Sequence, residues 1–374
     1  MTVAAPVTVA APVPVARRST RILELDGMRG VAVTAVVLFH VQGEVMPYGF
    51  LGVDLFFVLS GYLITTILLT EGERPGGLWR FYKRRALRIW PIYYLMVLAS
   101  AAAAFAIRNS YPARANFGGL PYYLLYLQGV QAYWGGDMGE IFPGLGHTWT
   151  LAIEEQFYLF WPFVVRLCGR KWLAPASALL CVVSVVYRLQ THDNVVLLGH
   201  ADGLALGSLL AVVLLSLNAE SPWIAHLRRG GLVGAALSLV LILAVPLNGA
   251  KKDWLILAAA FLFFCLTTTV LLSEGASWLA PLRVRWLTQL GVISYGVYLY
   301  HVPIILGFEV ALRRIGISHP FGTGRPWWRA GLEMTTALTV ASLSWRFIER
   351  PILRLRDRIG ARQTGAVYGT RSIG

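Results

Sequence analysis

Apolar residues along the chain fall into long runs that are separated by short segments containing arginine. A helix of about 17 to 25 apolar residues is long enough to cross roughly 30 Å of hydrocarbon. The pattern predicts helices at residues 27–45, 50–70, 88–107, 150–166, 172–188, 201–217, 231–247, 255–272, 288–308 and 329–348. We therefore expect an all-α integral membrane protein with about ten transmembrane helices.

The basic residues between these runs predict how the chain is oriented. Cytoplasmic loops carry an excess of Lys and Arg. Placing the N-terminal arginines inside also places inside the basic segments 80–88, 166–171, 228–229 and 283–285 and the C-terminal tail. Both termini are therefore expected in the cytoplasm. The loop with Arg313, Arg314 and Arg325 then lies outside, against the charge rule, and either tertiary contacts or an anion site would explain it.

The remaining segments complete a single membrane domain. Residues 119–133 are short and aromatic, and a crossing there would invert every later loop, so we expect a re-entrant or interfacial segment on the outer side. Prolines interrupt the apolar N-terminus and its arginines follow the apolar part, which disfavours a signal peptide. We predict a disordered cytoplasmic tail at 1–21, a membrane domain at 22–353 and a basic tail at 354–374.

Composition supports the membrane assignment and excludes other classes. The chain of 374 residues is 56% hydrophobic and 14% charged, with a mean hydropathy of +0.60, which is more apolar surface than one soluble core buries. The net charge of +14 follows the arginine loops, where topology and lipid phosphates account for it, so no nucleic-acid partner is expected. The three cysteines lack metal-ligand spacing, and no metal site is predicted.

Ionisable side chains inside apolar runs are costly, and each is a candidate functional residue. Arg29 and His40 are eleven positions apart, which places them on one face of the first helix, roughly 16 Å apart along its axis. Asp54 stands at a similar depth across the first hairpin, so we predict that it contacts His40 and orients a general base. The alternative is a helix-capping Asp54 and a core histidine, which the membrane setting disfavours.

Two further groups point to substrate binding. Arg84, Arg85 and Arg88 begin the third helix at the cytoplasmic interface, where they would bind either a nucleotide phosphate or lipid phosphates. Ser60 is a possible nucleophile, but no base is evident near it, and close helix packing through Gly61 is the favoured role.

Polar residues also gather in the predicted outer halves of later helices. Two adjacent acids on a helix point about 100° apart, so only one of Glu154 and Glu155 is expected to face a site. Together with His40 and Asp54, we expect Glu154 or Glu155, Asp202 and His301 to form one shared polar cavity.

The ordered motifs of the chain resemble the membrane acyltransferase 3 family, proteins of about ten helices that O-acylate glycans, lipids and glycosylated natural products. The resemblance covers about residues 22–353. It rests on residues 25–30 with His40, and on residues 52–61, 84–88, 147–158, 294–303 and 347–351. One position departs from the pattern: His200 precedes Ala201-Asp202-Gly203 where many members have arginine, so a binding role carried over to it is in doubt.

The resemblance implies a function and a set of roles. It implies transfer of a short acyl group, such as acetyl, from cytoplasmic acyl-CoA to a sugar hydroxyl of an envelope glycan, glycolipid or glycosylated natural product at the cell membrane. Acyl-CoA would be a co-substrate, and no cofactor is expected. His40 would be the general base or a transient acyl carrier, which sequence does not separate. A glycolipid or small-molecule transporter is the alternative, but no internal repeat supports it.

The predicted site therefore has two parts. The catalytic residues are predicted as His40, Arg29, Asp54 and Glu155. Substrate binding is predicted for the arginines, which would hold the coenzyme A phosphates, and for the remaining polar residues of these motifs: Arg84, Arg85, Arg88, Ser60, Glu154, Tyr158, His147, Asp202 and His301.

Overall fold

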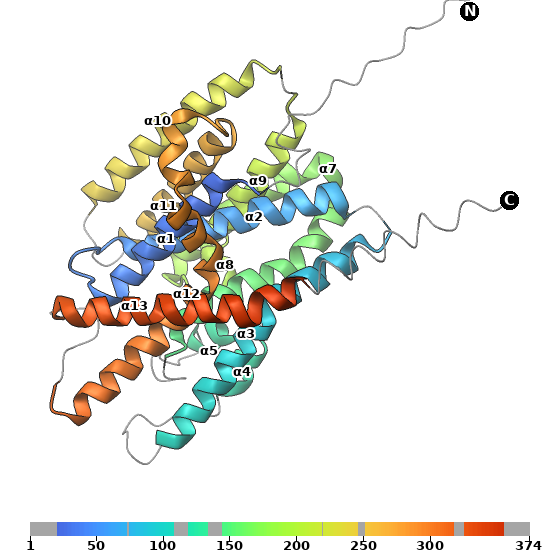
Figure 1. Ribbon diagram of the computed structural model, residues 1–374. Helices are drawn as coiled ribbons and strands as arrows, with labels where there is room; N and C mark the ends of the chain where they lie inside the picture. The colour runs from blue at the N-terminus through green and yellow to red at the C-terminus, as the bar shows by residue number, and fades with distance from the viewer. Residues whose placement is uncertain are drawn as a thin grey trace, which may run out of the picture.

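The computed structural model describes residues 21–72, 75–107, 119–133, 144–218, 220–245, 251–317 and 325–354. Every secondary-structure element within these ranges is helical (Figure 1), as the hydrophobic pattern predicts. The tails predicted at 1–21 and 354–374 lie almost wholly outside the described residues.

The described residues form the following helices in chain order. Their bounds are α1 (Leu23–Val41), η2 (Gly49–Leu51), α2 (Gly52–Glu71), α3 (Gly77–Ile107), α4 (Leu120–Leu124), α5 (Gln128–Tyr133), η4 (Gly146–Thr148), α7 (Trp149–Thr191), α8 (Leu197–His200), α9 (Asp202–Ser216), α10 (Trp223–Ala244), α11 (Lys251–Leu271), η5 (Ser277–Arg283), α12 (Arg285–Arg314), α13 (Trp327–Ser344) and η6 (Trp345–Glu349).

Each predicted run overlaps a helix of the described residues, but fewer segments qualify as spans by length and composition. Six helical segments of the described residues qualify: Gly49–Glu71, Gly77–Ala106, Gly146–Thr191, Trp223–Ala244, Lys251–Leu271 and Arg285–Arg314. The third covers two predicted runs, because α7 is two helices joined at Gly169, whose φ of 59° and ψ of 175° are open mainly to glycine. Ten crossings and the side of each terminus stay predictions.

The segment at 119–133 forms the short helices α4 and α5. They have five and six residues, or roughly 9 Å at most, so neither is long enough to cross a bilayer. The ring of Tyr126 stacks on Tyr93 of α3 at 4.3 Å, and the Tyr93 hydroxyl donates to the carbonyl oxygen of Tyr123 at 2.8 Å. The segment is thus held against α3, and its predicted position on the outer side is not tested.

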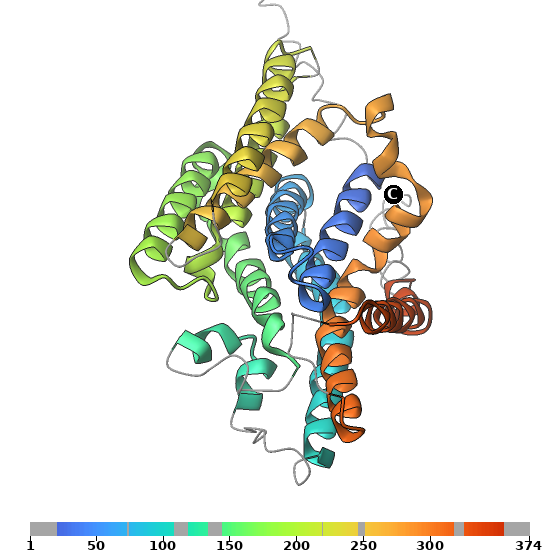
Figure 2. The same cartoon turned by 90° about the vertical axis from the view of Figure 1, so that its left-hand side faces the viewer.

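Close packing of α1, α2, α9 and α12 forms the centre of the protein. Figure 2 shows α1 beside α12, and α2 packs along α9. A Cβ at Gly61 of α2 would lie 2.0 Å from the carbonyl oxygen of Leu204 on α9, so only glycine permits this approach. The predicted packing role of the glycines in 52–61 is confirmed at this position.

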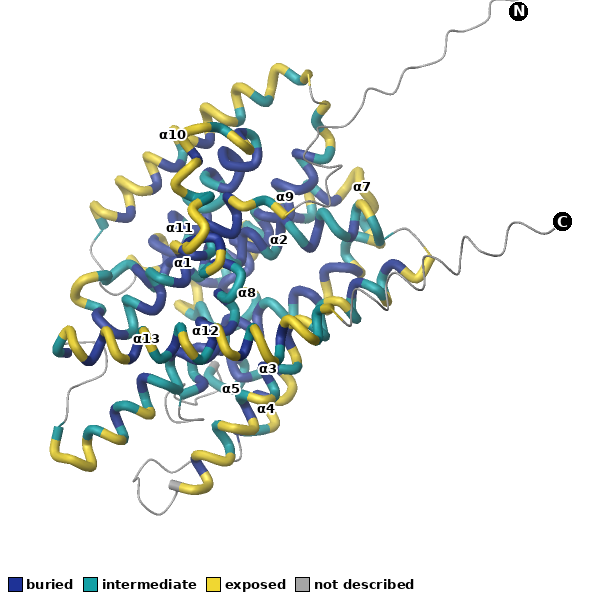
Figure 3. The backbone as a smooth tube through the Cα atoms, in the orientation of Figure 1, coloured by how far each residue is buried: buried dark blue, intermediate teal, exposed yellow. Residues whose placement is uncertain are grey.

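Burial follows the same arrangement (Figure 3). The central helices α1, α2 and α9 are largely buried, while α10 is largely exposed. The exposed positions of α10 include Leu237 and Leu243, which are 66% and 64% exposed. Apolar side chains of this kind are covered by lipid tails in a membrane.

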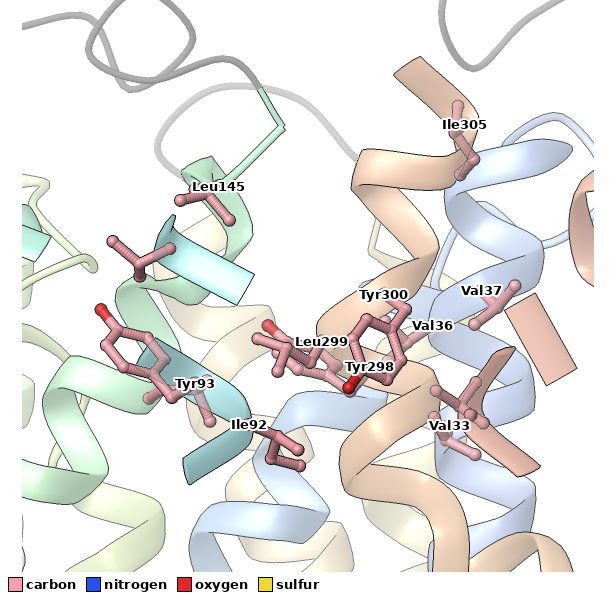
Figure 4. Close-up of a cluster of buried hydrophobic side chains, with 14 of the residues drawn as sticks. Val33, Val36, Val37, Ile92, Tyr93, Leu145, Tyr298, Leu299, Tyr300 and Ile305 are labelled. Atoms are coloured by element: carbon pink, nitrogen blue, oxygen red, sulfur yellow. The ribbon is translucent and has the colours of Figure 1, made fainter. Parts of the chain in front are cut away.

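A cluster of buried side chains joins α1, α3 and α12 (Figure 4). It contains Val33 and Val36 of α1, Tyr93 of α3, and Tyr298 and Leu299 of α12. The cluster fixes the relative position of these three helices, which carry much of the predicted site.

Two of the loop arginines that oppose the charge rule, Arg313 and Arg325, pair with acids, and a third arginine links these acids between α12 and α13. Arg313 donates to Glu309 at 2.6 Å, and Arg325 donates to Glu333 at 3.0 Å. The fully buried Arg329 bridges the two acids at 2.6 and 2.8 Å. Of the two explanations offered by the sequence, tertiary contacts are therefore present.

Candidate active site

A cavity of about 90 Å³ lies where α1, α2, α3, α7 and α12 meet. Six of the predicted site residues line it: Arg29, Ser60, Arg85, Arg88, Glu154 and Tyr158. Its other walls are mostly apolar and aromatic, namely Val53, Phe56, Phe57, Leu63, Ile89, Thr150, Leu151, Ser294, Tyr295 and Tyr298.

The cavity carries an excess of positive charge. Three guanidinium groups line it, from Arg29, Arg85 and Arg88, against the single carboxyl group of Glu154. Arg29 has a long contact of 3.4 Å with Asp26. Among the described residues neither Arg85 nor Arg88 forms an ion pair, and Arg85 lies 5.3 Å over the ring of Tyr158. Such a cavity suits an anionic ligand, and phosphate oxygens match guanidinium geometry.

Helix geometry separates the three clustered arginines. Arg85 and Arg88 are three residues apart and therefore share one face of α3. Arg84 is rotated by about 100° from Arg85, does not line the cavity, and forms an exposed ion pair with Glu71 at 2.8 Å. Arg88 is exposed while Arg29 and Arg85 are half-buried, so Arg88 lies at the mouth of the cavity.

Ser60 has a carboxyl partner that the sequence did not reveal. Its hydroxyl donates to Glu154 Oε1 at 2.6 Å and accepts from the Tyr158 hydroxyl at 3.0 Å. Of the two adjacent acids, Glu154 is thus the one that faces the cavity. Glu155 instead accepts from the indole of Trp90 at 3.1 Å, on the side of α7 facing α3.

Three histidines form a second group beside the cavity. The ring centroids of His40 and His301 lie 4.8 Å apart, and those of His147 and His301 lie 5.0 Å apart. His147 and His301 are buried, and His40 is half-buried. Neither ring nitrogen of His147 has a hydrogen-bond partner in the part of the chain that the structure describes.

The hydrogen bonds assign the proton on each ring of the His40–His301 pair. Nδ1 of His301 lies 2.6 Å from the carbonyl oxygen of Tyr298, and because a carbonyl only accepts, Nδ1 carries the proton and Nε2 the lone pair. That Nε2 lies 3.3 Å from Nδ1 of His40, which is also 2.9 Å from the carbonyl oxygen of Val36. Nδ1 of neutral His40 is therefore protonated, and Nε2 is its basic nitrogen.

The predicted contact between His40 and Asp54 is not the one that the structure shows. Asp54 Oδ1 lies 2.9 Å from Nε2 of His200. Asp54 stands in the first turn of α2 on the face that packs on α9, whereas His40 points to α12. Equal depth across a hairpin does not fix the rotation of each helix, and rotation decides which side chains meet.

His200 and Asp202 belong to a third polar group. Nδ1 of His200 lies 2.9 Å from the carbonyl oxygen of Asn194, so Nδ1 carries a proton. Nε2 faces the carboxyl group of Asp54, so a second proton must lie between Nε2 and Asp54. Asp202 accepts two hydrogen bonds from Arg188, at 3.0 and 2.8 Å, and both side chains are fully buried.

The polar residues therefore form three groups and not one shared cavity. Sequence reasoning missed Arg188 and Tyr298. Arg188 ends the predicted run 172–188 and is an ionisable group inside an apolar segment, which is the signal that would have found it. Tyr298 lies in the motif at 294–303, where its burial was not foreseeable. Within the described ranges no cluster of His, Cys, Asp and Glu has the arrangement of a metal site.

Comparison with known proteins identifies relatives of the whole membrane region. The family described as "Acyltransferase domain" matches residues 22–345. The peptidoglycan O-acetyltransferase OatA of Listeria monocytogenes is 30% identical over 371 residues, covering 90% of this chain and 57% of that protein. YrhL of Bacillus subtilis, provisionally named a peptidoglycan O-acetyltransferase, is 30% identical over 359 residues, covering 88% of this chain and 54% of that protein.

The chain thus spans about half the length of the curated relatives it matches. No solved structure matches it. Together with the six apolar helices, the matches identify a multi-pass protein of the plasma membrane, as the sequence predicts.

Proposed function

Because the chain belongs to the family of acyltransferase-domain proteins, we propose that it transfers a short acyl group, most simply acetyl, from acyl-CoA to a hydroxyl group of an envelope glycan. The donor, the acceptor and the residue roles are parts of this proposal. The relatives named as peptidoglycan O-acetyltransferases support acetyl as the group and a glycan as the acceptor class.

The observation that carries the proposal is the positive cavity beside the histidine group. Arg29 and His40 lie on the same helix, where Arg29 lines the cavity and His40 contacts His301 of α12. The rise of α1 separates them by roughly 16 Å. A coenzyme A molecule has anionic phosphates at one end and a thioester at the end of a long arm, so it fits a site that is cationic at one end and basic at the other.

The arginines bind and orient the donor in this proposal. Arg88 at the mouth and Arg85 and Arg29 farther in would hold phosphate oxygens through charge-assisted hydrogen bonds. Arg84, which was predicted to share this role, faces Glu71 and is expected to contribute little.

His40 performs the proton chemistry through Nε2. As a general base, it takes the proton of the acceptor hydroxyl while that oxygen attacks the thioester carbonyl; the carbon–sulfur bond then breaks and the proton passes to the departing thiolate. As an acyl carrier, Nε2 attacks the carbonyl itself and the thiolate leaves. The acceptor hydroxyl then attacks the acyl-imidazole, the imidazole leaves with the hydroxyl proton, and that proton passes to the thiolate. Both mechanisms need the tautomer that His301 supports.

Donor consumption by the purified protein in detergent tests the function. Acetyl-CoA is offered with peptidoglycan fragments or simple glycosides, and free thiol and acylated product are both measured. We expect both to form in stoichiometric amounts. If the protein instead moves a glycolipid across the membrane of reconstituted vesicles and consumes no thioester, it is a transporter, and the proposal is wrong.

A further inference from the structure

A second cavity, of about 400 Å³, takes no part in the proposed reaction. It is a groove with walls from α1, α2, α10, α11 and η5, and within the described residues no side chain of the candidate active site lines it. Its middle is apolar, with Leu55, Leu239 and Phe263 among the lining side chains. Such a lining suits hydrocarbon and not a polar substrate.

The groove has a buried floor and an open side. Leu55 and Ala259 on the floor are buried, while Val31 of α1 and Leu239 of α10 on the two rims are 52% and 48% exposed. Figure 1 shows α10 at the edge of the protein, where it packs along α11. The groove therefore opens sideways, toward the bilayer, and a ligand would enter it from the membrane.

The length of the groove matches one leaflet of a bilayer. Leu232 and Leu243 both line the groove on α10. They are eleven residues apart, which is roughly 16 Å along a helix. One leaflet contributes about 15 Å to the hydrocarbon core, half of its full thickness. A single lipid chain of one leaflet therefore has the length of the groove.

One end of the groove carries a cationic side chain and an indole. Arg228 is exposed and precedes Leu232 by four residues, so it lies on the groove face of α10, one turn beyond the apolar lining. Trp278 of η5 lines the same end, because η5 follows the C-terminal end of α11 and α10 packs along α11. Arginine and tryptophan are typical of the membrane interface, where lipid phosphates lie.

The opposite end of the groove is bridged by a hydrogen bond. Tyr48 lines that end, and its hydroxyl donates to the carbonyl oxygen of Val245 at 3.2 Å. This bond joins the loop after α1 to the end of α10. A chain that enters from the side is therefore expected to have its headgroup at the Arg228 end.

We propose that the groove binds one chain of an anionic phospholipid, with the lipid phosphate at Arg228 and the chain between α1 and α10. A guanidinium group matches the geometry of phosphate oxygens, and the buried floor accepts the chain. The inference does not depend on the proposed acyl transfer, and it assigns a lipid site to a different face of α1 from that of Arg29.

Native mass spectrometry of the full chain in a non-ionic detergent tests the headgroup assignment. The probes are phosphatidylglycerol and phosphatidylcholine with identical chains. We expect one phosphatidylglycerol to bind at least about fivefold more tightly than phosphatidylcholine, the effect of one basic residue near a lipid surface, and Arg228→Gln should abolish this preference. Lys252→Gln is the matched control, because Lys252 is also exposed but begins α11, at the opposite end of the groove. Screening over roughly 16 Å should keep its preference within about twofold of the wild type.

Filling the groove tests where the chain lies. Ala35 of α1 lines the groove. Ala35→Phe should raise the dissociation constant of phosphatidylglycerol at least about fivefold, the smaller end of the usual cost of overpacking. Ala178→Phe is the same substitution at an exposed position of α7 outside the described lining of the groove, and it should leave the constant unchanged. If Ala35→Phe does not fold, Leu239→Trp is judged by the same constant.

Four outcomes overturn the inference. Unchanged binding in Ala35→Phe, or an equal loss in Ala178→Phe, shows that the chain lies elsewhere. Equal affinity of the wild type for the two lipids, or a preference that Lys252→Gln loses and Arg228→Gln keeps, shows that Arg228 does not bind the phosphate. Lipid binding is measured without acetyl-CoA, so each of these outcomes leaves the proposed function intact.

Discussion

Replacement of Arg88 by alanine tests whether this arginine binds the acyl donor or only helps to orient the chain in the membrane. Arg88 lines the cavity mouth, is exposed, and has no ion pair within the described ranges, so its removal breaks no internal contact of that kind. A hydrogen bond to a charged group is worth about 1.5 to 3 kcal/mol. For an exposed arginine the lower value applies, which corresponds to about a tenfold change in affinity.

Steady-state kinetics with acetyl-CoA measure the effect. We expect Arg88→Ala to raise KM for acetyl-CoA about tenfold and to change kcat by less than about threefold, since the lost contact binds ground state and transition state alike. Arg84→Ala is the matched control, because Arg84 is also exposed on α3 but pairs with Glu71 outside the cavity. A surface ion pair contributes about 0 to 1 kcal/mol, and KM should change less than about twofold.

A donor without phosphates sharpens this test. Acetyl-pantetheine carries the same thioester but no nucleotide, so wild type and Arg88→Ala should have similar KM values for it. The donor-binding role of Arg88 is refuted if Arg88→Ala lowers only kcat, if Arg84→Ala has an equal effect, or if the Arg88→Ala defect persists with the phosphate-free donor.

Three further substitutions test the other polar groups. His301→Gln should lower kcat about 10- to 100-fold with little change in KM, because His301 orients His40 through Nδ1. The measurement is kcat as a function of pH, and an unchanged kcat would show that His301 does not position His40. Asp202→Ala should destabilise the protein by about 3 to 5 kcal/mol, because it leaves the fully buried Arg188 without its carboxylate. Thermal unfolding in detergent measures this loss of stability. The double variant Arg188→Met, Asp202→Leu should recover the lost stability, because it leaves no unpaired charge. Ser60→Ala should keep kcat within about tenfold if its hydroxyl only joins helices, and a loss of a thousandfold would make Ser60 a nucleophile.

The sequence predicted the helices better than the contacts between them. Apolar runs locate each helix because the bilayer imposes a length on them. Gly61 marks the close contact of α2 with Leu204 of α9, which only glycine permits. The spacing of Arg29 and His40 predicted a shared face, and both residues lie on the continuous helix α1, Arg29 at the cavity and His40 at His301.

Contacts between helices depend on rotation and tilt, which a single sequence does not fix. Asp54 was assigned to His40 from depth alone, yet its helix turns that carboxyl group toward His200. Ser60 appeared to lack a base because Glu154 is 94 residues away in sequence and adjacent only after folding. Tyr298 gave no signal beyond its motif, because its contacts with Thr150 and with the carbonyl oxygen of His147 form only after folding.

Single-turnover acyl transfer by His40→Ala tests the proposed function most directly, with His226→Ala as the matched control. His226 is an exposed histidine of α10 outside the cavity and the histidine group. With donor binding measured in parallel, we expect His40→Ala to bind acetyl-CoA as the wild type does but to transfer acetyl at least about a thousandfold more slowly, while His226→Ala transfers normally. Transfer by His40→Ala at a rate near that of the wild type would contradict the central role given to His40.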